Sequence, residues 1–220
     1  MTLMSEIQRN ALVGVGIATL LVAGGYVYLQ KTSTGAPTGD TGVPTTTVNG
    51  VSGTGGYTVE PVGTTPPLLK AISITASLPE DAKVTLRSMI EEQYAILRKE
   101  PTRVDIWLQL GVNRKIGGDF EGAIEAWEYV AQVAPKEVSA TAHGNLGDLY
   151  MYFIKDYAKA DTRFTQAVTL NPKVIDYYRA LFYLYRDIYK DKSKAQAILT
   201  LGLKNNPGNA DLLLLQKELT

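Results

Sequence analysis

The stretch NLGDLYMYFIKDYAKADTRFTQAVTLNP, residues 145–172, decides the fold of this 220-residue chain. It contains an alanine, a large apolar residue, a third residue without charge and a proline at successive offsets of four, three and five. This series occurs three times, at Ala123, Trp127, Val130 and Pro135, at Ala160, Phe164, Ala167 and Pro172, and at Ala195, Leu199, Gly202 and Pro207. A pattern that recurs at this interval predicts a fold built from stacked copies of one helical unit.

A second pattern precedes each series and predicts another helix in each unit. Its members follow the spacing i, i+3, i+4, i+7, which places them on one face of a helix. They are Trp107, Leu110, Gly111 and Arg114, then His143, Leu146, Gly147 and Tyr150, then Tyr178, Leu181, Phe182 and Tyr185. Short polar turns, GGD, KD and KDKSK, separate the two helices of each unit.

With these two patterns the chain resembles the tetratricopeptide repeat family, whose unit is a pair of antiparallel helices of about 34 residues. The resemblance implies an all-α domain over residues 70–220, with repeats at 104–137, 139–173 and 174–208. Each unit exposes an apolar face that only a neighbouring unit covers, so the expected fold is an α-solenoid of three helix pairs.

Additional helices are expected to cap both ends of the solenoid. Ser77 and Glu80 form a capping-box pattern, which predicts a helix from there to about Lys99. The preceding residues, 71–78, are expected to be extended and to lie on the solenoid. Asn209 can cap a short C-terminal helix, whose four successive leucines cover more of its surface than one buried face needs.

Residues 11–29 contain no charged side chain. As a helix they span roughly 28 Å, close to the hydrocarbon thickness of a bilayer. Tyr26 and Tyr28 lie at one end, where an aromatic belt is expected. We therefore predict one transmembrane helix over residues 11–30, preceded by a cytoplasmic stub of residues 1–10. A cleaved signal peptide is the alternative.

The flanking sequence predicts the orientation of this anchor and its connection to the helical domain. No lysine or arginine occurs between Thr32 and Leu69, which favours translocation of the C-terminal side. The expected location is the cell membrane, with a single pass and the C-terminal domain outside the cytoplasm. Residues 31–69 are rich in threonine, glycine and proline, so they cannot bury enough apolar surface to fold and are expected to form a flexible linker.

Composition argues against most chemical functions. The 22 basic and 22 acidic residues cancel, so no net charge points to a nucleic-acid partner. The absence of cysteine excludes thiolate metal sites and cysteine nucleophiles, and His143 is the only histidine. His143 lies in a packing pattern, which predicts a structural role. We expect no catalytic residue, no metal, no cofactor and no enzymatic activity.

The resemblance implies that the first helix of each pair lines a concave groove. Tyrosine and arginine, which are common in binding hot spots, are present at the positions expected to face it. The predicted peptide-binding residues are Lys115, Asn145, Asp148, Tyr152, Arg179, Tyr183 and Arg186. The arginines favour a protein or peptide ligand that carries an acidic group.

Together these features predict a membrane-tethered adaptor or scaffold that binds a protein or peptide. The chain is similar in architecture to single-pass bacterial proteins that display such repeats outside the cytoplasm, some of which assist envelope assembly or secretion. The alternative is a structural membrane protein that forms homo-oligomers. Its contacts would be a small-residue pair in the anchor, Gly14 and Ala18, and the leucine-rich C-terminal helix.

Overall fold

The computed structural model describes residues 65–66 and 71–219. The chain divides into two compact units between Glu60 and Pro61, and every described residue belongs to the second unit. The predicted stub, the predicted anchor with its Gly14–Ala18 contact, and all but two residues of the predicted linker lie outside the described residues. Among the residues that are described, no helix has the length and apolar character needed to cross a membrane.

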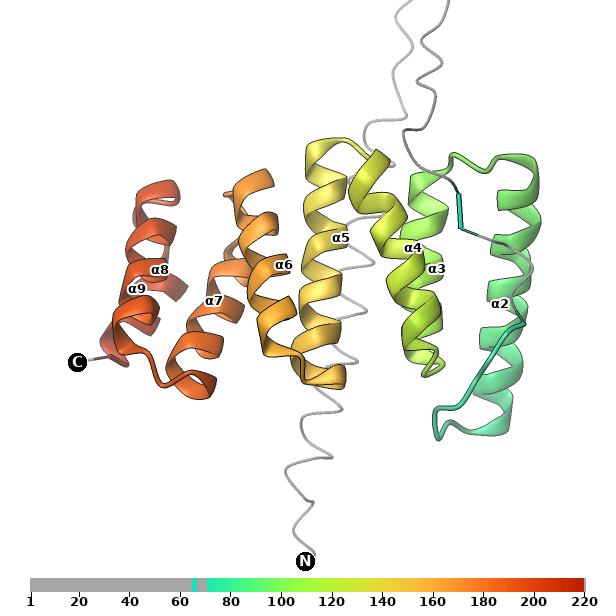
Figure 1. Ribbon diagram of the computed structural model, residues 1–220, viewed down its shortest axis with the longest axis horizontal. Helices are drawn as coiled ribbons and strands as arrows, with labels where there is room; N and C mark the ends of the chain where they lie inside the picture. Colours follow the sequence, from blue (N-terminus) through green and yellow to red (C-terminus); the bar gives the residue numbers. More distant parts are fainter. Residues whose placement is uncertain (1–64, 67–70, 220) are drawn as a thin grey trace, which may run out of the picture. The chain divides into compact units, whose positions relative to one another are not determined.

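The helical domain is all-α, as the sequence predicts, and residues 71–219 contain no β-strand. Its helices follow one another along a row in the order of the sequence (Figure 1). They are α2 (Glu80–Lys99), α3 (Val104–Ile116), α4 (Phe120–Val133), α5 (Lys136–Asp148), α6 (Tyr157–Leu170), α7 (Ile175–Tyr183), α8 (Lys192–Asn205) and α9 (Ala210–Lys217). Two π-helical stretches, η1 (Leu149–Ile154) and η2 (Leu184–Ile188), extend α5 and α7.

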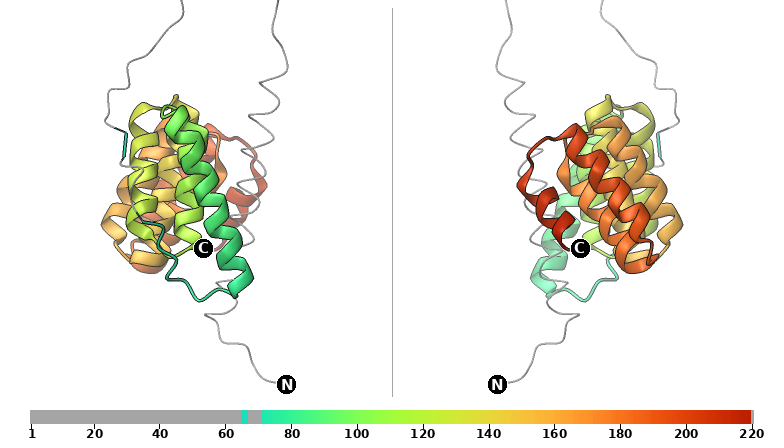
Figure 2. Two further views of the ribbon diagram at one scale, coloured as in Figure 1. Left: turned by 90° about the vertical axis from the view of Figure 1, so that its right-hand side faces the viewer. Right: turned by 90° about the vertical axis from the view of Figure 1, so that its left-hand side faces the viewer.

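Helices that are consecutive in the sequence pack against one another from α2 to α9. Figure 2 views the row from its two ends, with α2 foremost on one side and α8 and α9 on the other. The repeated small residues Ala123, Ala160 and Ala195 are fully buried where the paired helices meet. A Cβ atom on Gly147 of α5 would lie 2.7 Å from the ring of Phe164 in α6, so only glycine allows this close approach.

The turns inside the three helix pairs share one backbone design. A residue with positive φ ends each first helix: Gly118 at 82°, Lys155 at 66° and Lys190 at 55°. An aspartate then caps each second helix by accepting a hydrogen bond from the backbone N–H three residues later. These bonds join Asp119 to Gly122 at 2.9 Å, Asp156 to Lys159 at 3.1 Å and Asp191 to Lys194 at 2.9 Å.

The π-helical stretches account for part of the extra length of the second and third units. The prolines that end the units lie 34, 37 and 35 residues apart from Pro101 onward. A π-helical turn holds an extra residue without breaking the helix. The first unit has no such stretch, whereas η1 and η2 occupy the ends of α5 and α7. Part of the extra length is therefore absorbed inside the first helices, and the turns that follow keep the shared design.

At the N-terminal end, the segment before α2 is extended, as expected. The backbone N–H groups of Thr75 and Ala76 donate to the carbonyl oxygen of Gly117, at 2.7 and 3.0 Å. The prediction of a capping box was wrong: α2 begins at Glu80, and Pro79 occupies the N-cap position without a side-chain hydrogen bond. The bonds to Gly117 keep the segment extended, so the helix starts only after the proline.

At the C-terminal end, Asn209 caps α9 as predicted, because its side chain accepts a hydrogen bond from the N–H of Leu212 at 3.1 Å. Leu212 and Leu215 are buried, whereas Leu213 and Leu214 are 41% and 61% exposed. Two of the four leucines therefore lie outside the hydrophobic core, in agreement with the sequence analysis.

Two polar residues of the packing pattern are buried with partners. Arg114 forms an ion pair with Asp119 and donates to the hydroxyl of Tyr94 in α2, so its charge is compensated inside the domain. His143 is buried with its Nδ1 atom 3.5 Å from a guanidinium nitrogen of Arg163. Burial, together with the nearby Arg163 charge, lowers the pKa of His143 to about 4. His143 is buried, as its place in the packing pattern predicts.

Candidate binding face of the first helices

The residues predicted to bind a ligand all lie on the first helices of the three pairs. Lys115 is on α3, Asn145 and Asp148 are on α5, Tyr152 is on η1, Arg179 and Tyr183 are on α7, and Arg186 is on η2. All seven are partly or well exposed to solvent. We call Lys115, Asn145, Asp148, Tyr152, Arg179 and Tyr183 the binding face.

Electrostatic interactions show that the members of the binding face lie near one another across three helices. The Asp148 carboxylate on α5 interacts with the charges of Lys115 on α3 and Arg179 on α7, the first helices of the two neighbouring pairs. The Tyr152 hydroxyl interacts with Asp148, with Arg179 and with the hydroxyl of Tyr183. The structure therefore brings together five of the seven residues that the sequence analysis selected.

Lys115 lies among aromatic rings at one end of this group. Its ammonium nitrogen is 5.9 Å from the ring centre of Trp127 and 5.5 Å from that of Phe153. Burial of the amino group lowers its pKa, and the attraction of Asp148 opposes this shift. The aromatic rings stabilise the cation without using its N–H donors, so these remain able to reach an acceptor.

Asp148 is the central charge of the binding face. Burial raises the pKa of its carboxyl group from the ordinary value of 3.8 to about 6, although the nearby Lys115 and Arg179 charges lower it. Neither cation makes an ion-pair contact with Asp148. The carboxylate is thus partly removed from water while it keeps acceptor positions for a donor from outside the domain.

The tyrosines add apolar surface around this carboxylate. Tyr152 is 49% exposed, and burial raises the pKa of its hydroxyl to about 12. The sequence analysis missed Tyr177, which interacts electrostatically with Asp148. Gly144 was the available signal, since a Cβ atom there would lie 2.6 Å from the Tyr177 ring. A glycine inside a helix often marks such a close approach.

The arginines are already engaged by carboxylates of their own chain. Arg179 pairs with Asp176 at 2.6 Å. Arg186 pairs with Asp187 at 2.6 Å and with Glu218, the C-cap residue of α9. Arg186 therefore helps to hold the C-terminal helix, and its guanidinium also lies 5.0 Å from the ring centre of Tyr183. Because both arginines already have carboxylate partners, they give less support to the predicted preference for a ligand with an acidic group.

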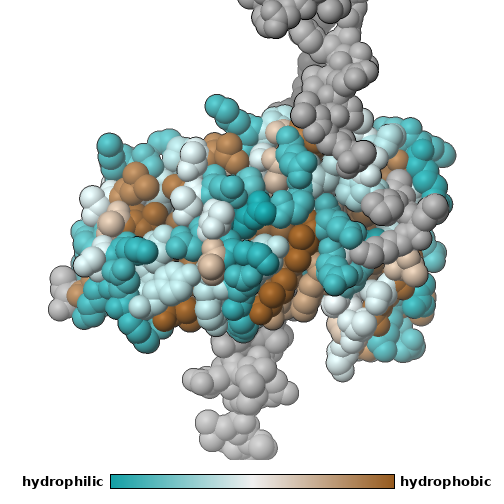
Figure 3. Space-filling model, in the orientation of Figure 1, coloured by the Kyte–Doolittle hydropathy of each residue, from teal (hydrophilic) through white to brown (hydrophobic). Residues whose placement is uncertain are grey.

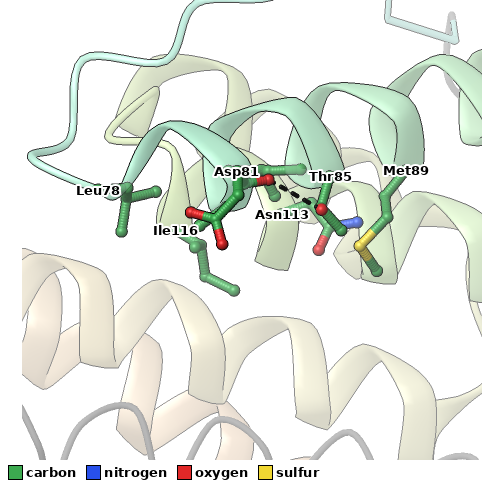
Figure 4. A pocket seen from close by; sticks show the side chains of 8 residues that line it. Leu78, Asp81, Thr85, Met89, Asn113 and Ile116 are labelled. Carbon is green, nitrogen blue, oxygen red and sulfur yellow. Dashed lines mark hydrogen bonds between the residues drawn. The ribbon is translucent and has the colours of Figure 1, made fainter.

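A separate pocket of about 340 Å³ lies between α2 and α3 (Figure 4). It is lined by Leu78, Asp81, Ala82, Thr85, Leu86, Met89, Asn113 and Ile116. The lining is mainly apolar in character. The Thr85 hydroxyl within it donates to the backbone oxygen of Asp81 at 2.9 Å. The sequence analysis did not find this pocket, because it depends on how the capping helix meets the first repeat.

The remaining surface in the orientation of Figure 1 is mixed in character. Polar and charged residues cover most of it, and hydrophobic residues reach it in separate patches, the longest near α4 and α5 (Figure 3). No group of three or more histidine, aspartate or glutamate side chains suited to a metal ion occurs within residues 71–219.

No known family model matches the sequence, and no curated protein is significantly similar to it.

Proposed function

We propose that the helical domain is a solenoid of the tetratricopeptide type that binds an extended segment of another protein along the binding face. The repeated burial of a small residue and of a large residue four positions later supports this fold assignment. In this proposal the three helix pairs stack in one direction, and the first helices line the concave groove that the resemblance implies.

The observation that carries the proposed function is the electrostatic interaction of Asp148 with Lys115 and Arg179. These three residues lie on three successive first helices. A ligand that crosses these helices meets the Lys115 cation, the Asp148 carboxylate, the Arg179–Asp176 pair and the exposed ring of Tyr152. Charged and aromatic groups on a rigid helical surface are typical of protein recognition sites. The half-buried Asn145 amide can add hydrogen bonds to the ligand backbone.

The proposal includes a membrane tether. The uncharged run at residues 11–29 is long enough for one transmembrane helix, and residues 31–69 have the composition of a flexible linker. The domain then works outside the cytoplasm as an adaptor or scaffold of the bacterial cell envelope. It holds its protein partner near the membrane, and no catalysis, metal or cofactor is involved.

Site-specific photo-crosslinking in native membranes tests this function. A photoreactive amino acid at Tyr183 should yield a discrete crosslinked product with the partner. The matched control position is Thr169 in α6, whose side chain is exposed away from the binding face. Crosslinking from both positions alike, or from Thr169 alone, would contradict the proposed groove.

Self-assembly is a second candidate function, and the exposure of Leu214 and Leu213 favours it. Exposed neighbouring leucines on a terminal helix are suited to contact with a second copy. Sedimentation of the full chain in detergent should then show an oligomer that Leu213→Ser, Leu214→Ser reduces to a monomer. A monomer before and after the substitutions would exclude this interface.

A further inference from the structure

The arginines at the binding face form ion pairs with carboxylates of the same chain, whereas the other two charged residues of the face, Lys115 and Asp148, form none within the described part of the chain. Arg179 is paired with Asp176, and Arg186 with Asp187 and Glu218, so their charges are compensated within the chain. Within the described residues 71–219, neither Lys115 nor Asp148 makes an ion pair. These two side chains therefore hold the uncompensated charges of the face.

The two charges attract each other but do not meet. Each is among the causes of the other's pKa shift, although neither forms an ion-pair contact with the other. Lys115 lies over the rings of Trp127 and Phe153, on the side of the first pair. Asp148 lies on the neighbouring first helix, with Tyr152 and Tyr177 close to it. A ligand can therefore contact both groups at once.

The surroundings of each charge specify what it accepts. The Lys115 ammonium group offers N–H donors to a carboxylate. The Asp148 carboxylate accepts hydrogen bonds, and the tyrosine rings near it favour a cation that packs on them. A ligand with only acidic groups would bring negative charge next to Asp148, and one with only basic groups would repel Lys115.

We propose that the binding face selects an extended peptide segment that carries one acidic and one basic side chain, the acidic one at Lys115 and the basic one at Asp148. This inference rests on the proposed function. The Lys115 and Asp148 charges interact with each other, and an extended chain rises about 3.3 Å per residue with alternate side chains on the same face. The two ligand charges are therefore about two or four residues apart in sequence.

Fluorescence anisotropy with three matched sets of synthetic peptides tests the proposal. Each labelled peptide has about ten residues, long enough to cross three helices, and contains one tyrosine in a neutral background. One set carries two glutamates, one carries two lysines, and one carries a glutamate and a lysine about two or four residues apart, on the same face of the extended chain. The full chain in detergent micelles, at a pH well above the pKa of Asp148 of about 6, should bind the mixed set about tenfold more tightly than either other set.

Substitutions assign the two charges of the ligand. Asp148→Asn should remove the preference for a lysine in the peptide, and Lys115→Met should remove the preference for a glutamate. Glu121→Gln in α4 and Lys204→Met in α8 are the matched controls, since both side chains are exposed on second helices. Thermal melting of each variant checks that the domain remains folded.

The outcomes separate this inference from the function on which it rests. Equal binding of the three sets, or an unchanged preference in both Asp148→Asn and Lys115→Met, would overturn the charge selection and leave peptide binding intact. Absence of binding to every set would contradict peptide binding by this face altogether.

Discussion

The packing positions of the helix pairs repeat the same kinds of residue from pair to pair, whereas the binding face does not. At the packing positions the same kinds of residue return in each pair, as at Ala123, Ala160 and Ala195, and all are fully buried. On the binding face the three first helices contribute different residues: Lys115, Asp148 and Arg179. Repetition is what stacking requires, whereas a ligand with a defined sequence requires differences between the repeats. The unrepeated positions are therefore the informative ones for function.

The largest expected effect is at Arg114, where a packing position carries a charge. Arg114→Ala would leave Asp119 without its buried partner and the Tyr94 hydroxyl without its donor. Breaking such a pair costs about 3–5 kcal/mol of stability. Arg103→Ala is the control, since Arg103 pairs with Asp105 and Glu100 at the surface, where a pair contributes about 1 kcal/mol or less. Chemical denaturation of both variants measures the difference, and similar losses would contradict this description of Arg114.

Ala160→Trp should have the next largest effect. Ala160 is fully buried between α5 and α6, so the larger side chain would overpack the contact and cost about 1–3 kcal/mol. Thr169→Trp places the same residue at an exposed position of the same helix and should change the melting temperature little. If the two melting temperatures fall equally, α6 is oriented differently from what we describe.

Asp148→Asn should stabilise the domain near neutral pH, in contrast to the two packing variants. The pKa of Asp148 is higher in the folded state, about 6, than its ordinary value of 3.8, so the native state loses stability as the pH rises from about 4 to about 6. One pKa unit corresponds to about 1.4 kcal/mol. Because the side chain is partly solvated and the variant loses the attraction of Lys115, we expect a gain of about 1–2 kcal/mol.

The dependence on pH is the decisive feature of the Asp148→Asn experiment. The gain in unfolding free energy should be present at pH 7 and should vanish below about pH 4, where the wild-type carboxyl group is protonated in both states. Urea unfolding at several pH values provides the measurement. A gain that does not change with pH would show that it comes from packing and that the carboxylate is well solvated.

The smallest expected effect on stability is at Arg186. It holds α9 through Glu218 at the surface, so Arg186→Ala should cost about 1 kcal/mol or less. The loss should be confined to the C-terminal end, where hydrogen exchange of the α9 amides should become faster. An equal increase in exchange throughout α3 to α8 would contradict this local role.

The repeated features of the fold were predictable from the sequence because they follow helical spacing. The burial of Trp107, Leu110 and their counterparts follows from the i, i+3, i+4, i+7 pattern, and the cap at Asn209 from its residue type. The π-helical stretches were not predicted, since they depend on where an extra residue is absorbed. The capping box at Ser77 failed because tertiary hydrogen bonds to Gly117 keep that segment extended.

The candidate site was predictable from the sequence only in part. The resemblance to tetratricopeptide repeats implied Lys115, Asp148 and Arg179 as residues on one side of the first helices. The pairing of Arg179 with Asp176 was overlooked, although the two lie three residues apart on a helix, a spacing that favours ion pairs. The apolar pocket beside Met89 and the contribution of Tyr177 depend on contacts between helices that are distant in sequence. Such contacts leave no periodic signal.

The most direct test of the proposed function is photo-crosslinking from Asn145 in native membranes, with and without the double substitution Arg179→Ala, Tyr183→Ala. Both substituted side chains are partly exposed, so the melting temperature should change little. Truncation of hot-spot residues typically costs about 2 kcal/mol or more of binding free energy, which is roughly a thirtyfold loss of affinity. We predict that the crosslinked partner seen with the parent chain is lost from the double variant. An equal yield of the same product from both proteins would contradict binding of the partner along the first helices.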